Sequence, residues 1–362
     1  MQKTRKFDQN FRFKRSNRAK NSLQECFFAF FVLGTYYKLN ADQYVLARVK
    51  YSEAMTAVLE NPVREMKLPP VDRTAILDDA FVLAQAKEIT FDDAALILPA
   101  YAKEEHYVPW VRILTTLSKF YGVFEGAADA ADFEGAADQL FSTFKGFVAL
   151  MIDPIFKKIG FDKKETDGHL DSQLREMLVS AQARFLSTEE PVRAEATRRY
   201  NAWREDASTP LCPPSIRTSI FHIVAENGGE EVFNQLKQIH DEAHDDVVKK
   251  AVFQSIGWLP TKALKVAALE WASFSGEVKL QDFQYVIYTV ATSNNDGGKV
   301  TWDWYEANFM RLREKLASND SNFARLAGTV LAGIGTQEEL DHAKELKKNS
   351  RNFRVNREMR EK

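Results

Sequence analysis

The sequence has few cysteines, little net charge and no apolar run long enough to cross a membrane. Only Cys26 and Cys212 are present among its 362 residues. Two cysteines so far apart argue against a disulfide framework and fit a reducing compartment, so the cytoplasm is the expected location. The apolar run at residues 26–33 is far shorter than the roughly 20 residues of a membrane span, and no small-residue cleavage site follows it. We therefore expect neither a membrane span nor a working secretory signal.

The formal net charge is only -2, from 49 lysines and arginines against 51 acidic residues, but the charges are unevenly placed. The first 33 residues carry +6 and residues 344–362 carry +5, which leaves -13 for the rest of the chain. Basic tails can bind nucleic acid or anionic lipid, whereas an acidic body repels phosphate and favours cationic groups such as the amino termini of peptides. We give the acidic body more weight and expect no nucleic-acid partner.

Sequence signatures of catalysis are also scarce. There is no Ser-His-Asp order, glycine-rich phosphate loop or Cys-x-x-Cys zinc spacing. Residues 240–244, His-Asp-Glu-Ala-His, place two histidines at the spacing of a zinc-binding His-Glu-x-x-His helix. The glutamate is one residue late, which rotates its side chain by about 100° around the helix, and Ala263 stands where a third ligand is needed. We therefore expect no catalytic and no metal-binding residues, and we interpret residues 240–244 as a solvated helix end.

Two periodicities divide the chain. Residues 36–51 are rich in Tyr and Val around a central Asn-Ala-Asp-Gln break, which is typical of a β-hairpin. Beyond residue 52, apolar residues recur at three- and four-residue spacing, which predicts helices almost throughout. The helices form antiparallel pairs of roughly 40 residues, the unit of an α-solenoid of the HEAT or armadillo kind. The pairs differ too much from one another to establish a repeat from the sequence alone, so the pattern by itself predicts an all-α fold after a short hairpin.

Local signals also predict individual helix boundaries. Thr90 and Asp93 have the spacing of a capping box at a helix start. Pro213 and Pro214 suit the first turn of a helix that runs to about Asn227.

Two groups of residues admit a functional and a structural interpretation. Aromatic and basic side chains alternate along residues 302–313, as in surfaces that stack nucleobases, but their spacing fits one buried helical stripe better. Asp72-Arg73 followed by Asp78-Asp79 supplies paired carboxylates, as an acid–base site needs. We favour an interhelical salt-bridge set for these four residues.

The most specific segment is residues 68–110. It contains Pro-Val-Asp-Arg at 70–73, Leu-Asp-Asp-Ala-Phe at 77–81 and Glu-x-x-x-Pro-Trp at 105–110. This order resembles the start of the C-terminal helical domain of the zinc aminopeptidases related to aminopeptidase N and the puromycin-sensitive aminopeptidase, a domain of the endoplasmic-reticulum-aminopeptidase type. The resemblance covers residues 36–346.

The resemblance implies an α-solenoid that closes like a bowl over a zinc domain, encloses the peptide chamber and limits which peptides enter. It also implies that the hairpin is a remnant of the β-sandwich that precedes this domain in the family. The expected organisation is a basic leader at 1–34, the hairpin remnant at 35–52, the helical domain at 53–348 and a basic tail at 349–362.

The family's zinc is bound by a separate catalytic domain, so the resemblance implies a chain that holds no cofactor and is inactive by itself. Some peptide-trimming relatives touch the distal end of the peptide with an aromatic and a basic residue. The matching positions are Tyr121 and Gly122, which makes Tyr121 the candidate peptide-chamber residue. Another basic contact of these relatives falls near Gly257 and is absent. Residues 225–227, Ala-Glu-Asn, match only the end of the family's Gly-x-Met-Glu-Asn motif, and we interpret them as a chance match.

Three functions follow as hypotheses. The first is a substrate-chamber and regulatory domain of a metalloaminopeptidase that removes N-terminal residues from peptides, with a peptide substrate and a catalytic aminopeptidase fragment or other protein as partners. The second is a stand-alone α-solenoid scaffold that binds a peptide or protein in its concave face. Nucleic-acid binding by the two basic tails is a third hypothesis, which the acidic body disfavours.

Overall fold

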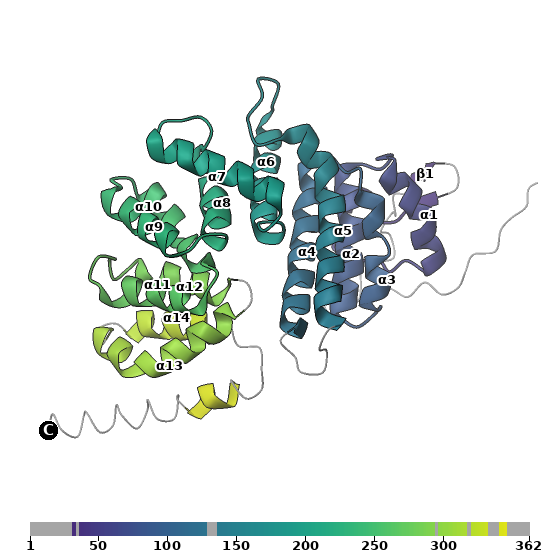
Figure 1. Cartoon of the computed structure of the whole chain (residues 1–362). Coiled ribbons are helices and arrows are strands. Elements are labelled where there is room, and N and C mark those ends of the chain that lie inside the picture. Colours follow the sequence, from purple (N-terminus) through teal and green to yellow (C-terminus); the bar gives the residue numbers. More distant parts are fainter. Residues whose placement is uncertain are drawn as a thin grey trace, which may run out of the picture. The chain divides into compact units, whose positions relative to one another are not determined.

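The computed structural model describes residues 31–33, 36–128, 136–293, 296–316, 320–331 and 340–345. In these ranges the chain is nearly all helical (Figure 1). Its contacts divide it into two units, which are described separately: unit 1 comprises residues 1–122 and 142–178, and unit 2 comprises residues 123–141 and 179–362. The predicted leader, apart from residues 31–33, and the predicted tail lie outside the described residues.

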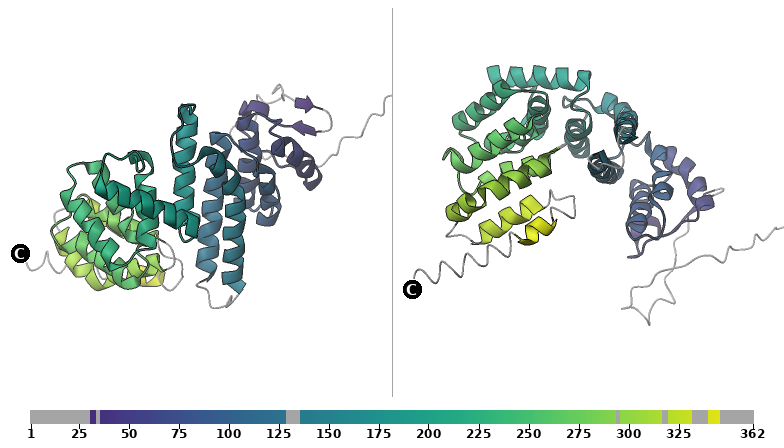
Figure 2. Two further views of the ribbon diagram at one scale, coloured as in Figure 1. Left: turned by 45° about the horizontal axis from the view of Figure 1, so that its top comes forward. Right: turned by 60° about the horizontal axis from the view of Figure 1, so that its bottom comes forward.

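Unit 1 begins with two short strands and continues with helices. Its elements are β1 (Phe31–Leu33), β2 (Tyr36–Lys38), η1 (Ala41–Gln43), α1 (Glu53–Arg64), α2 (Pro70–Gln85), α3 (Phe91–Ala95), η2 (Leu98–Tyr101), and most of α4 (Tyr107–Ala128), α5 (Ala136–Ile159) and α6 (His169–Phe185). Within this unit α4 and α5 lie side by side (Figures 1 and 2). Their apolar faces supply fully buried core residues, namely Trp110, Ile113, Leu117, Val148 and Ile152.

Unit 2 consists of successive helices that pack in pairs. Its elements are α7 (Glu190–Glu205), α8 (Pro214–Glu226), α9 (Glu230–Glu242), α10 (Asp246–Phe253), η4 (Ile256–Trp258), α11 (Lys262–Phe274), α12 (Phe283–Ala291), α13 (Gly297–Lys315) and α14 (Asp320–Leu331). α7 packs on α8, α9 on α10, α11 on α12 and α13 on α14. The pairs follow one another as rows of helices in Figures 1 and 2. Most of the fully buried residues in this unit are apolar, among them Ile220, Phe221, Leu236, Val252 and Val286.

The helix boundaries expected from local signals are confirmed. Thr90 caps α3, because its hydroxyl accepts the Asp93 N–H at 3.0 Å while the Asp93 carboxylate accepts the Thr90 N–H at 3.2 Å. α8 begins at Pro214, follows Pro213 at its N-cap and ends beside Asn227. None of the helices in the described ranges has the length and apolarity that crossing a membrane requires.

The predicted β-hairpin at residues 35–52 is wrong. Only β2 is a strand in this range, and it pairs antiparallel with β1, which precedes the predicted hairpin. The N–H of Asp42 donates to the Asp72 carboxylate at 2.9 Å, and the N–H of Val49 donates to the Asp79 carboxylate at 3.1 Å. Because these carboxylates of α2 satisfy the backbone donors, residues 39–52 follow the helix surface instead of pairing as strands.

Candidate functional site

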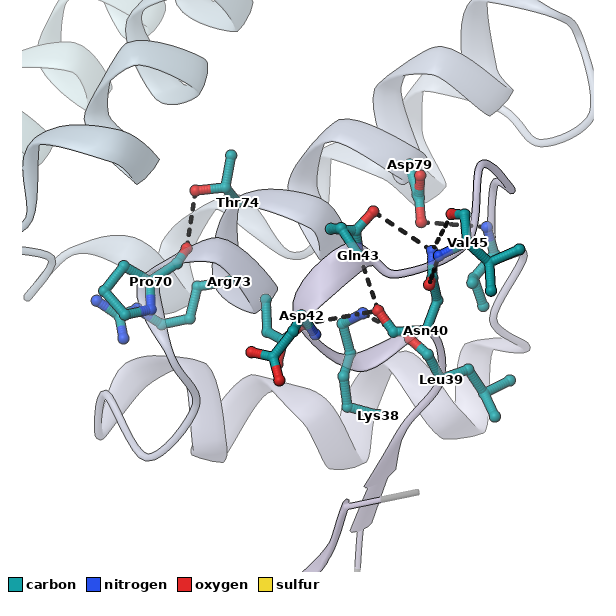
Figure 3. Close-up of polar contacts among 12 residues, drawn as sticks. Lys38, Leu39, Asn40, Asp42, Gln43, Val45, Pro70, Arg73, Thr74 and Asp79 are labelled. Carbon is teal, nitrogen blue, oxygen red and sulfur yellow. Dashed lines mark hydrogen bonds and ion pairs between the residues drawn. The ribbon is translucent and has the colours of Figure 1, made fainter. Parts of the chain in front are cut away.

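Residues 36–51 are tied to the helices of unit 1 by buried charges (Figure 3). Lys38 is fully buried and donates to the carbonyl oxygens of Leu39 at 2.6 Å and Asn40 at 3.4 Å. Its Nζ lies 3.6 Å from Oδ1 of the equally buried Asp72. Burial lowers the pKa of Lys38 and raises the pKa of Asp72, and their mutual attraction offsets only part of each shift. Because removing two charges from water costs about as much free energy as their attraction returns, this pair joins β2 to α2 without adding much stability.

A second group of charges joins the end of this segment to α2 and α4. Arg48 contacts Asp78 and lies 3.1 Å from Asp79, while Arg112 of α4 also contacts Asp78. Burial raises the pKa of Asp79, although Arg48 opposes this shift. The six side chains form the anchoring network, defined as Lys38, Arg48, Asp72, Asp78, Asp79 and Arg112. Asp72, Asp78 and Asp79 therefore form ion pairs as predicted, but only the pair of Asp78 with Arg112 joins two helices. The prediction of an interhelical set is confirmed in part.

Arg73 and Glu104 form a separate ion pair in the core of unit 1. Their side chains are each 1% exposed, and Nε and Nη2 of Arg73 donate to the two carboxylate oxygens at 2.6 Å and 2.7 Å. The same carboxylate accepts the N–H groups of Glu105 and His106, both at 2.9 Å, just before α4 begins. The Glu104 carbonyl accepts the indole N–H of Trp110 at 2.9 Å. One carboxylate thus sets both the packing of α2 and the start of α4.

Residues 240–244 do not form a metal-binding helix turn. α9 ends at Glu242, so His244 lies beyond the helix and is exposed, whereas His240 is buried. The His240 ring meets Phe253 and Trp271 at centroid distances of 5.1 Å and 5.2 Å. The predicted solvated helix end is correct for His244 and wrong for His240. Within the described ranges, no group of three or more His, Cys, Asp or Glu could hold a metal ion.

Residues 225–227 close α8 and serve its packing. The Asn227 amide donates to the carbonyl oxygens of Ser187 at 2.9 Å and Ile223 at 2.8 Å. Oε2 of Glu226 lies 3.3 Å from Nε2 of His222, one helical turn earlier. These contacts give both residues a structural role within unit 2.

The environment of His222 is not predicted by the sequence. Its ring stacks on Trp258, with centroids 3.8 Å apart and planes inclined by 23°. The guanidinium carbon of Arg184 lies 4.9 Å from the same indole, and Arg184 donates to the Thr292 carbonyl at 3.2 Å. Burial lowers the pKa of His222; Glu226 opposes this shift and Arg184 adds to it. A His with Glu four residues later inside an apolar helix is the one local signal for this cluster.

The buried His222 is expected to make unit 2 less stable in acid. Its folded-state pKa lies below the unfolded value of about 6.5. Below pH 6.5 the unfolded chain therefore binds a proton at this residue more readily than the folded chain does, and the stability that neutral His222 contributes is lost as the pH falls through the folded pKa. The free energy of unfolding should decrease between pH 7 and 5 by up to about 1.4 kcal/mol per pH unit. The free energy of unfolding is measured by urea unfolding at several pH values. For His222→Gln it should change less with pH than it does for the unchanged chain. His244→Gln, at an exposed position, is the matched control and should show the same pH dependence as the unchanged chain. An equal pH dependence of the free energy of unfolding in all three proteins would contradict the expectation.

Comparison with known proteins identifies the family. A family model described as ERAP1-like C-terminal domain matches residues 36–361, nearly the whole chain. The chain belongs to this family. This result confirms the resemblance that residues 68–110 and the helices after them show to the C-terminal domain of aminopeptidases.

The proteins that are similar to this ERAP1-like C-terminal domain include several M1 aminopeptidases. Aminopeptidase M1 of Arabidopsis thaliana is 30% identical over 273 residues, which cover 74% of this chain and 29% of the relative. The puromycin-sensitive aminopeptidase of Caenorhabditis elegans is 23% identical over 293 residues, which cover 81% of this chain and 29% of the relative. The glutamyl aminopeptidase of Bitis rhinoceros is 22% identical over 313 residues, which cover 85% of this chain and 31% of the relative. The chain spans about a third of the length of these relatives.

The structure places the candidate residue Tyr121 of this ERAP1-like domain inside unit 1. Its side chain is 3% exposed, and its ring lies 6.5 Å from that of Phe144. Gly122 is exposed and has open space around the position of a Cβ atom. A peptide contact by Tyr121 stays a prediction that requires its ring to become accessible. Gly257 packs so closely on α12 that a side chain has no room there.

Proposed function

We propose that this chain is the substrate-chamber and regulatory domain of a zinc metalloaminopeptidase. It contributes shape and closure, while the part of the enzyme that binds zinc cleaves N-terminal residues from the peptide. The observation that carries the proposal is the match of residues 36–361 to the C-terminal part of M1 aminopeptidases. Peptides with a free amino terminus are the proposed substrates, since the relatives are named as aminopeptidases.

The finer architecture proposed for unit 2 is an α-solenoid of the HEAT or armadillo type. α8, α10, α12 and α14 contact one another in turn, as do α9, α11 and α13, which supports two stacked layers of helices. On α12, Tyr285 and Tyr288 are 40% and 56% exposed. Arg184 reaches Thr292 just beyond the end of this helix. The layer that contains α12 is the proposed peptide-facing side, because it offers aromatic surface and a cation together.

A reducing compartment, the cytoplasm, is the proposed location. Cys212 is buried as a free thiol, and burial raises its pKa to about 11. A thiol with this pKa is largely protonated at neutral pH and reacts slowly. Fractionation of cells that express the chain tests the location, and recovery in a secretory fraction would contradict it.

The test combines the full chain with the part of Arabidopsis aminopeptidase M1 that precedes its matched region. Hydrolysis of an amino-acid amide and of a decapeptide is measured for each protein alone and for the mixture. The chain alone should cleave neither substrate, and the mixture should cleave the decapeptide faster than the catalytic portion does alone. An unchanged decapeptide rate in the mixture would contradict the proposal.

The same experiment distinguishes the second function. Tight binding of the decapeptide by the chain alone, without any effect on the catalytic portion, would favour a stand-alone scaffold that holds a peptide in its concave face. Isothermal titration of the decapeptide into the chain supplies this measurement.

A further inference from the structure

Buried arginines in the described ranges have carboxylate partners, with one exception. The pairs, each with a nitrogen–oxygen distance of 2.6 Å, are Arg73 with Glu104, Arg175 with Asp167 and Arg199 with Glu195. The exception is Arg217, near the start of α8, which is 7% exposed and forms no ion pair with any described residue. An isolated charge inside a protein is costly, and buried charges are therefore normally paired.

The contacts that Arg217 does make are to neutral groups. Its Nη2 donates to the Cys212 carbonyl at 3.4 Å, and its guanidinium carbon lies 5.2 Å from the centre of the Trp203 ring. The Cys212 thiol also meets the guanidinium, but burial raises the pKa of this thiol to about 11, so the sulfur carries no charge at neutral pH. The aromatic ring and these dipoles offset only part of the cost of burying the charge.

Two N–H donors of this cluster have no acceptor among the described residues. They are Nε of Arg217 and Nε1 of Trp203, and both atoms are shielded from solvent. Trp203, on α7, is itself only 7% exposed. Buried donors are nearly always satisfied, and each one left without an acceptor costs free energy. Because the guanidinium lies next to the indole, one small acceptor can serve both side chains.

The nearest carboxylates along α7 do not supply this acceptor. Glu195 is shared by Arg198 and Arg199, and the Asp206 carboxylate accepts the N–H and the hydroxyl of Ser208. A peptide or a second protein does not reach side chains that are more than nine-tenths buried. A water molecule would accept hydrogen bonds but would leave the guanidinium charge uncompensated. A small anion supplies both the acceptor and the charge.

We propose that Arg217 and Trp203 bind one monovalent anion of chloride size where α7 packs on α8. The ion accepts hydrogen bonds from Nε of Arg217 and Nε1 of Trp203, and it neutralises the buried guanidinium. Because the two donors belong to different helices, the ion joins α7 to α8. The stability of unit 2 then depends on the chloride concentration.

The chloride dependence of folding tests this proposal. Urea unfolding of the full chain, followed by circular dichroism, is measured while sodium chloride replaces sodium gluconate at constant ionic strength. Gluconate is too large for the proposed site. A ligand that binds only the folded chain should raise the folding equilibrium constant about tenfold for each tenfold increase in chloride above the dissociation constant. No dependence up to about 0.15 M chloride, the physiological ionic strength, would overturn the proposal.

Three variants assign the dependence to this cluster. Arg217→Met removes the charge that requires the ion, so the stability of this variant should not change with chloride. Trp203→Phe keeps the aromatic ring but loses the N–H, and should bind chloride several-fold more weakly. Arg175→Met is the matched control, because it removes a buried arginine that Asp167 already neutralises, and its chloride dependence should equal that of the unchanged chain. A chloride dependence that persists in Arg217→Met refutes the assignment.

Crystals of the unchanged chain soaked in sodium bromide locate the ion without any variant. Anomalous scattering should show a bromide ion beside Nε of Arg217 and Nε1 of Trp203. A water molecule in that place, without anomalous signal, would overturn the proposal. A bromide ion there without chloride-dependent stability in solution would mean binding at crystal concentration only, and this result also contradicts the proposal.

Discussion

Replacing Glu104 with alanine is expected to lower the free energy of unfolding by about 3–5 kcal/mol, because it leaves the Arg73 charge buried without a partner. Arg73 loses hydrogen bonds of 2.6 Å and 2.7 Å to the carboxylate. The N–H groups of Glu105 and His106 lose their acceptor at the start of α4. Urea unfolding followed by circular dichroism measures the change.

Two further variants separate the buried pair from ordinary surface charge. Arg193→Ala breaks an exposed pair with Glu190 on α7 and should change the free energy of unfolding by less than about 0.5 kcal/mol. The joint replacement of Arg73 by Met and Glu104 by Leu should recover much of the loss, because both charges leave the core together. If Glu104→Ala costs no more than Arg193→Ala, the buried pair does not organise α4 as the structure indicates.

Replacing Gly257 with alanine is expected to cost about 3 kcal/mol, the upper end of the range for overpacking. A Cβ atom at Gly257 would lie 2.5 Å from the backbone nitrogen of Val290 and 2.6 Å from the carbonyl carbon of Thr289. Both are backbone atoms of α12, so no side-chain rotation relieves the contact and η4 or α12 must move. Guanidinium unfolding at neutral pH measures the loss.

Gly328→Ala is the matched control, since a Cβ atom there meets nothing within 4 Å. It should leave stability unchanged or raise it by up to about 1 kcal/mol, because alanine favours helix more than glycine does.

The close approach at Gly257 also bears on peptide binding. Gly257→Arg should destabilise unit 2 rather than supply the basic contact expected from the family resemblance. A Gly257→Ala protein as stable as the unchanged chain would contradict the packing of η4 on α12.

The features that the sequence predicts correctly are those set by neighbouring residues. The capping box of Thr90 and the start of α8 at Pro214 each depend on side chains within a few positions of one another. The family was also predictable, because the order of short motifs across residues 68–110 is specific. Helical periodicity predicted the nearly all-helical fold for the same local reason.

The incorrect and missing predictions share a different cause. The hairpin at residues 35–52 fails because Asp72 and Asp79, thirty residues away in sequence, accept the backbone N–H groups that a second strand would use. The partners of Asp78, Arg48 and Arg112, are also thirty or more residues away in sequence. Periodicity identifies an apolar helix face, but it does not show that Tyr121 and His222 lie inside the packing. Each of these outcomes depends on tertiary contacts that a single sequence does not display.

Hydrolysis of a long peptide by a hybrid enzyme tests whether this helical domain controls which peptides a metalloaminopeptidase cleaves. In the hybrid, residues 36–361 of this chain replace the matched region of Arabidopsis aminopeptidase M1. We predict that the hybrid cleaves an amino-acid amide and that its rate on peptides depends on their length, unlike the rate of the catalytic portion alone. A hybrid with the same length dependence as the catalytic portion alone, or hydrolysis by the 362-residue chain by itself, would contradict the account.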